Sequence, residues 1–229
     1  MNQRYGTLDR QTRSLSHQQA REVYDRIGRG QDTQRIYEDA AIDVLLQHAA
    51  FARAGSVVEF GCGTGRIARR LLREQLSATA SYLGLEQSPR MVAIATPRLA
   101  AFGDRARIVQ TDGRIAFPVA DQSVDRVLST YVFDLLSDSD IAIALAEAAR
   151  VLVPGGRLCL VNLTFGRRPL ERALTGLIER VHAFRPALLG GCRPVAVAHR
   201  LPLPHWQHSH HSIVRRFALT SEVLVATRL

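Results

Sequence analysis

Two periods of apolar and polar residues alternate along the chain and predict its helices and strands. Short, largely apolar runs typical of buried strands occur at residues 57–60, 81–86, 106–110, 123–130 and 157–163. Apolar residues at three- and four-residue spacing, with turn residues at the borders, indicate helices at 16–27, 33–53, 64–76, 88–102, 138–152 and 169–184. Pro97 should bend the fourth of these helices. Strands separated by helices favour an α/β fold, a parallel sheet doubly wound with helices on both faces.

Two further strand-like runs, 213–219 and 221–229, close the chain. The connection between them is too short for a helical crossover, so we expect them to be antiparallel neighbours. The expected sheet is therefore seven-stranded and mostly parallel, with an antiparallel C-terminal hairpin strand.

The composition suits one folded domain with an uneven charge. The chain has 229 residues and is 46% hydrophobic and 22% charged, which excludes disordered and fibrous classes. All 30 basic residues are Arg, so chemistry on a lysine is excluded. Residues 157–229 contain 11 Arg and three acidic residues, which gives +8 of the total +9. A basic segment of this kind attracts phosphate, anionic lipid or an acidic substrate.

The remaining compositional signals favour a reducing compartment. Cys62, Cys159 and Cys192 are widely spaced and odd in number, so neither a disulfide framework nor a zinc site is indicated. The N-terminal residues are polar and lack the apolar core of a signal peptide, and no apolar stretch is long enough to span a bilayer. We expect a cytoplasmic protein, with peripheral attachment to a membrane as the alternative.

The sharpest motif follows the first strand. Gly61, Gly63 and Gly65 form a G-x-G-x-G turn after Glu59 and lead into a helix, which is the setting of a nucleotide-binding turn. The spacing differs from G-x-G-x-x-G and no phosphate-binding loop with a lysine exists, so a pyrophosphate ligand is disfavoured. Cys62 lies inside the turn, where a small packing residue is needed.

An acid followed by this turn resembles the Rossmann-like S-adenosylmethionine-dependent methyltransferases, and the likeness extends over about residues 20–165. The resemblance implies that Glu59 serves the methionine ammonium, directly or through water, and that Glu86 bridges the ribose hydroxyls. It also implies that Asp112 accepts a hydrogen bond from the adenine amino group, although a turn-forming Asp-Gly pair is the alternative. The implied cofactor-binding residues are Glu59, Gly61, Cys62, Gly63, Gly65, Glu86, Gln87, Ser88, Asp112, Gly113, Thr130 and Tyr131.

The resemblance also divides the chain. It is nearest to the ubiquinone/menaquinone C-methyltransferases and to the bacterial phospholipid N-methyltransferases. It implies an N-terminal helical lid (1–54) and a Rossmann-like domain (55–229) with an acceptor-side insertion at about 164–212. The helix expected at 169–184 has one apolar face and an Arg-rich remainder, which suits either a solvated flank of the sheet or a surface facing lipid.

Three residues are candidates for catalysis. Tyr24 in the lid either covers the sulfonium or anchors the lid to the core. His205 and His208 lie in a run of four histidines between 205 and 211, which we interpret as an irregular loop that could supply a general base. No acid or cysteine accompanies these histidines, so we expect no metal site.

The expected reaction is transfer of a methyl group from S-adenosylmethionine to a small-molecule or lipid-like acceptor in one in-line displacement. Such a reaction requires mainly alignment and the exclusion of water. Two alternatives stay open. A nucleic-acid methyltransferase would suit the basic last third, but S-T-Y-V stands at 129–132 where an N-P-P-Y-like block would be expected. A non-catalytic S-adenosylmethionine-binding protein would carry the same cofactor blocks.

Overall fold

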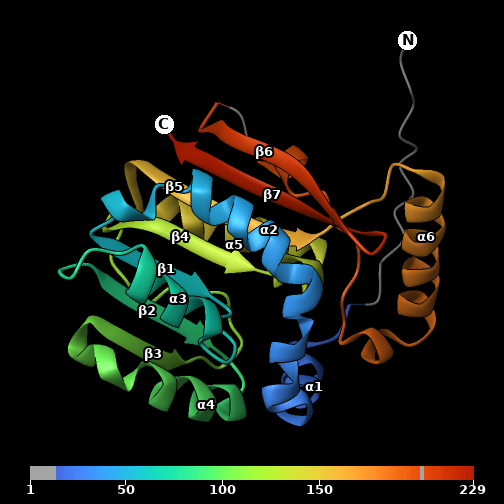
Figure 1. Cartoon of the computed structure of the whole chain (residues 1–229), viewed down its shortest axis with the longest axis horizontal. Coiled ribbons are helices and arrows are strands. Elements are labelled where there is room, and N and C mark those ends of the chain that lie inside the picture. Colours follow the sequence, from blue (N-terminus) through green and yellow to red (C-terminus); the bar gives the residue numbers. More distant parts are fainter. Residues whose placement is uncertain (1–13, 202–203) are drawn as a thin grey trace.

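A single mixed sheet forms the centre of the molecule, and helices cover both of its faces (Figure 1). The computed structural model describes residues 14–201 and 204–229. The strand order is β3-β2-β1-β4-β5-β7-β6. The strands are β1 (Ser56–Phe60), β2 (Ser81–Glu86), β3 (Ala106–Gln110), β4 (Val124–Thr130), β5 (Leu152–Leu163), β6 (Trp206–Arg216) and β7 (Leu219–Arg228).

The pairing confirms the expected fold class. Strands β1 to β5 are mutually parallel, β7 is antiparallel to β5, and β6 is antiparallel to β7. The hairpin turn lies at Phe217 and Ala218, two residues with positive φ. Two strands begin well before their expected first residues. β5 begins at Leu152 and includes the P-G-G sequence, and β6 begins at Trp206, so most of the expected histidine loop is edge strand.

The helices lie close to the predicted ranges. They are α1 (His17–Ile27), α2 (Arg35–His48), α3 (Arg66–Glu74), α4 (Pro89–Leu99), α5 (Asp138–Val151) and α6 (Pro169–Phe184). Ser16 caps α1 in a capping box with Gln19, and Ser137 caps α5 through the backbone N–H of Asp140. Helix α4 continues through Pro97 to Leu99 and is followed by a 3₁₀ segment, Ala100–Arg105.

Two apolar cores hold the layers together. On one face, Ile42 and Leu45 of α2 and Leu71 of α3 are completely buried against the sheet. On the other face, Ile141 of α5 packs with a cluster that includes Trp206 of β6. The alternation of side chains along each strand supplies both cores. Residues 1–13 of the expected lid lie outside the described residues, and the rest of it forms α1, α2 and the turns that follow each helix.

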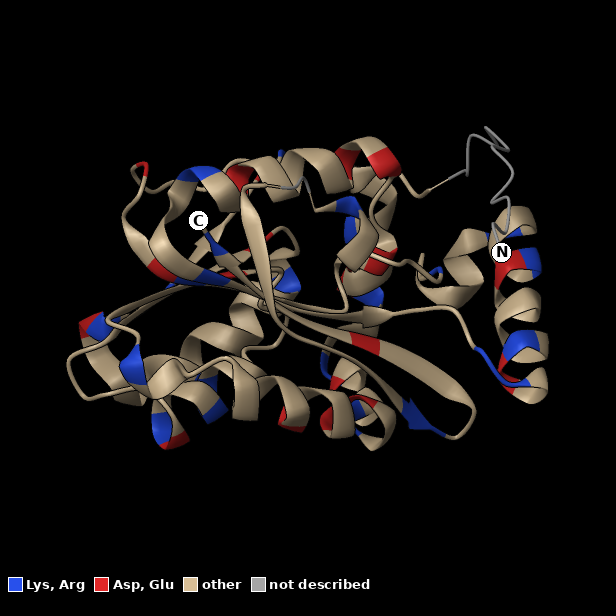
Figure 2. Ribbon diagram, turned by 90° about the horizontal axis from the view of Figure 1, so that it is seen from above, with Lys and Arg blue, Asp and Glu red and all other residues tan. Residues whose placement is uncertain are grey.

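Helix α6 lies at the right of Figure 1, beyond one end of the sheet. Its buried residues are polar. Glu171, Thr175 and His182 are buried, whereas Leu170, Leu177 and Phe184 are 71%, 56% and 87% exposed. The Glu171 carboxylate accepts from the backbone N–H groups of Arg167 and Arg168, so these two donors at the start of the helix are paired. The basic side chains of α6 lie at one end of the molecule (Figure 2). No helix among residues 14–201 and 204–229 has the length and apolar character needed to cross a bilayer.

Candidate functional site

The glycine turn lies where β1 ends and α3 begins. The N–H groups of Gly61 and Cys62 both donate to the Leu85 carbonyl of β2, at 2.9 and 3.1 Å. Gly61 has φ +75°, and a Cβ there would lie 2.4 Å from Val132. A Cβ on Gly63, with φ +53°, would meet no atom within 4 Å. The first glycine thus permits close packing beneath the turn, and Gly63 leaves open space above it.

Glu86 binds the same turn from the end of β2. Its Oε2 accepts from the N–H of Gly63 at 2.9 Å and its Oε1 accepts from the N–H of Ser88 at 2.8 Å. Glu86 is 8% exposed and lines a pocket at the carboxyl ends of β1, β2 and β4, which we call the main pocket. Burial raises the pKa of this carboxyl, while the backbone donors act in the opposite direction. Each oxygen keeps acceptor capacity for a further donor, as binding of two ribose hydroxyls requires.

Glu59 lies behind the lining of the main pocket. It is 1% exposed beneath the turn, and the Tyr82 hydroxyl donates to its Oε2 at 2.5 Å. Burial raises its pKa to about 8. Glu59 is absent from the pocket lining, whereas the neighbouring Phe60, Gly61 and Gly63 are part of it. The structure therefore gives Glu59 a supporting place under the turn, and no direct contact with the methionine group follows from it.

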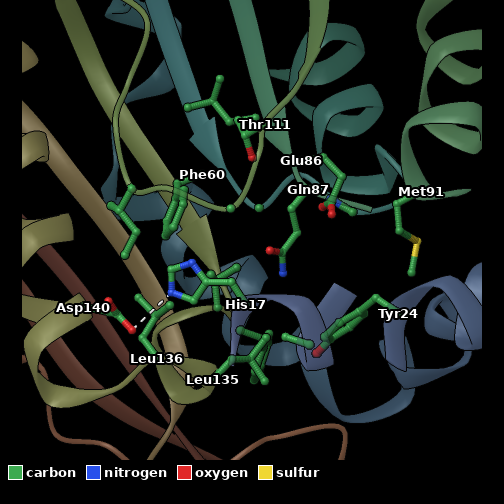
Figure 3. A pocket seen from close by; sticks show the side chains of 18 of the residues that line it. His17, Tyr24, Phe60, Glu86, Gln87, Met91, Thr111, Leu135, Leu136 and Asp140 are labelled. Atoms are coloured by element: carbon green, nitrogen blue, oxygen red, sulfur yellow. Dashed lines mark hydrogen bonds and ion pairs between the residues drawn. The ribbon is translucent and has the colours of Figure 1, made fainter. Parts of the chain in front are cut away.

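The main pocket opens at the carboxyl ends of β1, β2 and β4, where ligands bind in open α/β sheets. Figure 3 shows Glu86 and Gln87 on one side of the pocket and Phe60 and His17 near its centre. Tyr24, a residue of α1, lies on the other side. Of the residues expected to bind cofactor, the lining contains Gly61, Gly63, Glu86, Gln87, Gly113, Thr130 and Tyr131.

The other expected cofactor residues do not line this pocket. Ser88 is fully buried, caps α4 and donates to Asp25 of α1. Cys62 is a buried packing residue, and burial raises the pKa of its thiol. Gly65 packs beside Ala95 of α4. All three lie behind the lining, where they support the turn and the helices.

Asp112 also lies outside the lining of the main pocket. Its carboxylate accepts from the backbone N–H and from the Nε of Arg114, and its side chain is 57% exposed. The main pocket is lined instead by the flanking Thr111, Gly113 and Arg114. This arrangement fits the alternative of a turn-forming Asp-Gly pair.

A second space adjoins the main pocket, and we call it the tyrosine chamber. The two spaces share Tyr24, Gln31 and Tyr131. The other residues of the tyrosine chamber are mostly apolar or aromatic. They come from α2 and the turn before it, the turn after β4, the end of β5, α6 and the segment after it, and the start of β7: Gln34, Tyr37, Asp134, Leu163, Ile178, Leu189, Cys192 and Leu219. Residues from both ends of the chain thus meet beside the pocket.

Tyr131 lies at the junction of the two spaces in a strained conformation. Its φ of +55° is uncommon for a residue with a bulky side chain. Its N–H donates to the Val161 carbonyl at 2.7 Å, its hydroxyl pairs with Ser221 at 2.8 Å, and its ring packs edge-on against Tyr37. The neighbouring β5 and β7 therefore hold this backbone geometry in place.

The histidines expected to supply a base lie elsewhere. Trp206 of β6 pairs with Arg228 of β7, and the adjacent Thr227 pairs with Arg157 in the first half of β5. His205 and His208 are therefore at the amino end of the parallel strands, opposite the pocket, and both are exposed. The edge strand carries His205 and His208 away from the pocket, so neither can act as a general base there. Within the described ranges, no three His, Cys, Asp or Glu residues converge as metal ligands would.

His17, Asp140 and Asp134 are ionisable residues of the site that the sequence pattern does not single out. His17 and Asp140 line the main pocket and face each other across its mouth (Figure 3). Asp134 lines the tyrosine chamber on the 3₁₀ turn Phe133–Leu135, just beyond β4. The sequence signal that could have identified Asp134 is its position shortly after the end of the strand that became β4. Nothing in the sequence pattern indicates which residues of helices α1 and α5 face each other.

The residues fit S-adenosylmethionine on two observations. The space above Gly63 allows a ligand to approach the backbone, and the Glu86 carboxylate is nearly buried with acceptor capacity left on both oxygens. Bound there, S-adenosylmethionine would supply an activated methyl group. Glu86 and the turn would hold its nucleoside, and Tyr24 and Tyr131 would stand between it and the tyrosine chamber.

Known structures share this architecture. The [4+2]-cyclase SpnF superposes with a TM-score of 0.72 at 16% identity, covering 94% of this chain and 97% of its own. A Thermotoga maritima S-adenosylmethionine-dependent methyltransferase, described as a possible histamine N-methyltransferase, gives 0.62 at 19% identity, covering 92% and 100%. The fold is therefore that of the Rossmann-like methyltransferases.

The sequence comparisons identify the family. Residues 57–156 match a family described as a methyltransferase domain. An uncharacterized methyltransferase of Geobacillus kaustophilus is 33% identical over 144 residues, 63% of each chain. One of Geobacillus sp. (strain WCH70) is 31% identical over 159 residues, 69% of this chain and 70% of the relative. The chain belongs to the S-adenosylmethionine-dependent methyltransferases, and S-adenosylmethionine is its cofactor.

Proposed function

We propose that the protein transfers the methyl group of S-adenosylmethionine to a small, largely apolar acceptor held in the tyrosine chamber. The observation that carries this proposal is the shared wall. Tyr24, Gln31 and Tyr131 line both the main pocket and the tyrosine chamber, so a donor in one space and an acceptor in the other would be neighbours. Alignment of donor and acceptor is the main requirement of a displacement at an activated methyl group.

The lining of the tyrosine chamber supports a small or lipid-like acceptor. Leu163, Ile178, Leu189 and Leu219 give it an apolar wall, and three tyrosines add aromatic surface. This chemistry suits the subgroups that the sequence resembles, the ubiquinone/menaquinone C-methyltransferases and the phospholipid N-methyltransferases. The positions of α1 and α6 around the space favour an enclosed molecule over a polymer lying on an open basic surface.

The residues of the chain have three tasks in this reaction. Glu86 and the glycine turn hold the nucleoside of the donor. Tyr24 and Tyr131 separate the two spaces and exclude water beside the methyl group, and their aromatic faces favour a cationic centre. The apolar wall positions the acceptor without competing for the methyl group.

The test is a search for the acceptor with donor labelled in its methyl group. The purified protein is incubated with separate small-molecule, lipid and RNA fractions, and Glu86→Ala serves as the negative control. We expect label in an organic-extractable small molecule or lipid. Label in RNA would overturn the proposal in favour of a nucleic-acid methyltransferase. Tight donor binding without transfer to any fraction would instead support a non-catalytic role.

A further inference from the structure

Asp134 is a buried carboxylate with one unused oxygen. The residue is 1% exposed, and its Oδ2 accepts from the N–H of Leu163 at 3.4 Å. Its Oδ1 has no hydrogen-bond partner among the described residues. Buried polar atoms are nearly always paired, so an unpaired carboxylate oxygen in the wall of a cavity indicates a missing donor.

The charged neighbour of Asp134, Arg193, makes its side-chain hydrogen bonds through Nη2 to other residues, and its Nε has no partner among the described residues. Arg193 donates its backbone N–H to the Asp134 carbonyl at 2.9 Å, but its Nη2 donates to the Leu136 carbonyl and to Asp138, at 2.8 and 2.7 Å. Burial raises the pKa of Asp134, and the charge of the Arg193 guanidinium opposes this shift without a bond to the free oxygen. Asp134 lines the tyrosine chamber, and its unpaired Oδ1 is buried there.

A second unpaired acceptor lies in the same wall. Gln31 donates its Nε2 to Gln34 at 2.7 Å, which turns its Oε1 away, and this oxygen is buried without a partner. Two buried acceptors without donors, in a space lined mainly by aromatic and aliphatic side chains, suit a ligand that brings hydrogen-bond donors on an apolar body.

We propose that the acceptor is an aromatic molecule bearing a hydroxyl group, and that Asp134 is the catalytic residue that removes the hydroxyl proton through Oδ1. This inference rests on the proposed function and names its substrate class. The hydroxyl proton moves to Oδ1 while the acceptor oxygen forms a bond to the methyl carbon. The bond between sulfur and that carbon breaks, and its electron pair stays on sulfur. The products are an aryl methyl ether and S-adenosylhomocysteine, and Asp134 then releases the proton to solvent.

The other ionisable groups of the chamber are unsuited to this role. Burial raises the pKa values of Tyr24, Tyr37, Tyr131 and Cys192, so these groups stay protonated at neutral pH. Burial raises the pKa of Asp134 to about 7, which is near the optimum for a general base. The titratable and charged groups that face Asp134 are Tyr24 from α1, Tyr37 and Glu38 from α2, Tyr131 after β4, and Cys192 and Arg193 after α6.

Asp134→Asn tests the proposal, and Glu38→Gln is the matched control. The asparagine can accept from Leu163 as before but cannot accept a proton. Glu38 is also buried, and burial raises its pKa to about 7, but it bonds to Arg66 and does not line the chamber. The probes are 2-naphthol, 2-naphthylamine and 2-methoxynaphthalene. The measurements are S-adenosylhomocysteine formation between pH 5.5 and 9, calorimetric binding of 2-naphthol in the presence of S-adenosylhomocysteine, and the Tm of each variant.

We expect the wild-type protein to methylate 2-naphthol fastest, with kcat rising through an apparent pKa near 7. Asp134→Asn should lower kcat by about a hundredfold or more and remove this pH dependence, with KM and Tm nearly unchanged. Glu38→Gln should keep at least about a third of kcat and the same profile. The wild-type profile and the binding of 2-naphthol test the assignment even if a variant folds poorly.

Three results would overturn the inference while leaving the proposed function intact. These are Asp134→Asn with the kcat of the wild type, faster turnover of 2-naphthylamine than of 2-naphthol, or donor binding without binding or turnover of 2-naphthol. Failure of the proposed function has a different signature, since the labelled methyl group would then reach RNA or reach no acceptor in any fraction.

Discussion

The His17 Nε2 atom lies 3.3 Å from Oδ2 of Asp140, and this pair joins the first turn of α1 to the first turn of α5 across the mouth of the main pocket (Figure 3). The His17 side chain is 40% exposed and that of Asp140 is 24% exposed. Asp140 is held in turn by the hydroxyl of Ser137, the residue that caps α5. The pair therefore fastens the lid helix over the site, and its energy is that of a partly exposed contact.

We expect His17→Ala to loosen this closure without abolishing binding. The loss of one partly exposed pair should raise the Kd for S-adenosylmethionine by about two- to fivefold, mainly through faster dissociation. Stopped-flow dissociation and calorimetry measure both quantities. His199→Ala, at an exposed position outside the pocket lining, is the control. An unchanged dissociation rate in His17→Ala would show that the pair does not close the pocket.

Glu86 and Asp112 should differ sharply in their contribution to donor binding. Glu86→Ala removes a nearly buried carboxylate that lines the pocket, and we expect affinity for S-adenosylmethionine to fall at least about tenfold. Asp112→Ala removes an exposed carboxylate paired with Arg114, so its effect should be less than about threefold. Calorimetric titration of both variants decides the point. An equal loss in Asp112→Ala would place the adenine amino group on Asp112 after all.

Glu59 should make the stability of the protein depend on pH. Its pKa is about 8 in the folded protein and near 4.5 when unfolded, so the folded state binds the proton more tightly. Its contribution is complete below pH 4.5 and is lost as pH rises toward 8. Glu59→Gln keeps an acceptor for Tyr82 and removes the titration. We expect its Tm to match the wild type at about pH 4, below the unfolded pKa, and to exceed it by about 3 °C or more at about pH 8.5.

Differential scanning calorimetry across this pH range checks the expectation for Glu59. The difference between variant and wild type isolates this residue from the other buried carboxyls, which are common to both proteins. A constant difference at all pH values would mean that Glu59 keeps one protonation state throughout.

Helix α6 should attach the protein to anionic lipid. Its outer stripe of Leu170, Leu177 and Phe184 is flanked by arginines, the combination that favours an anionic interface. We expect sedimentation with phosphatidylglycerol vesicles, weakened by salt, and little binding to phosphatidylcholine. Leu177→Glu with Phe184→Glu should reduce binding about tenfold or more. Ile143→Glu, at an exposed apolar position on α5, is the control. If both changes reduce binding equally, α6 is not the contact.

Local sequence determined the elements and the cofactor turn. Ser81–Glu86 and Pro169–Phe184 have the bounds that periodicity predicts, because side-chain spacing and capping act over a few residues. The positions of Gly61 and Glu86 in the pocket also follow from local rules, since both lie at the carboxyl end of a parallel strand. The interpretation of 205–211 as a loop was wrong, because the pairing of β6 with β7 extends the strand back to Trp206.

The tertiary structure decided which polar groups meet. Glu59 and Asp112 carry the expected residue types, but burial with Tyr82 and pairing with Arg114 keep them out of the lining. Asp134 becomes notable only because Tyr24, Ile178 and Cys192, from distant parts of the chain, surround it and leave one oxygen unpaired. Sequence thus determined the donor side of the site, which one strand-turn-helix unit and its neighbour build. The acceptor side depends on long-range packing of α1, α6 and the loop after it, which no local pattern encodes.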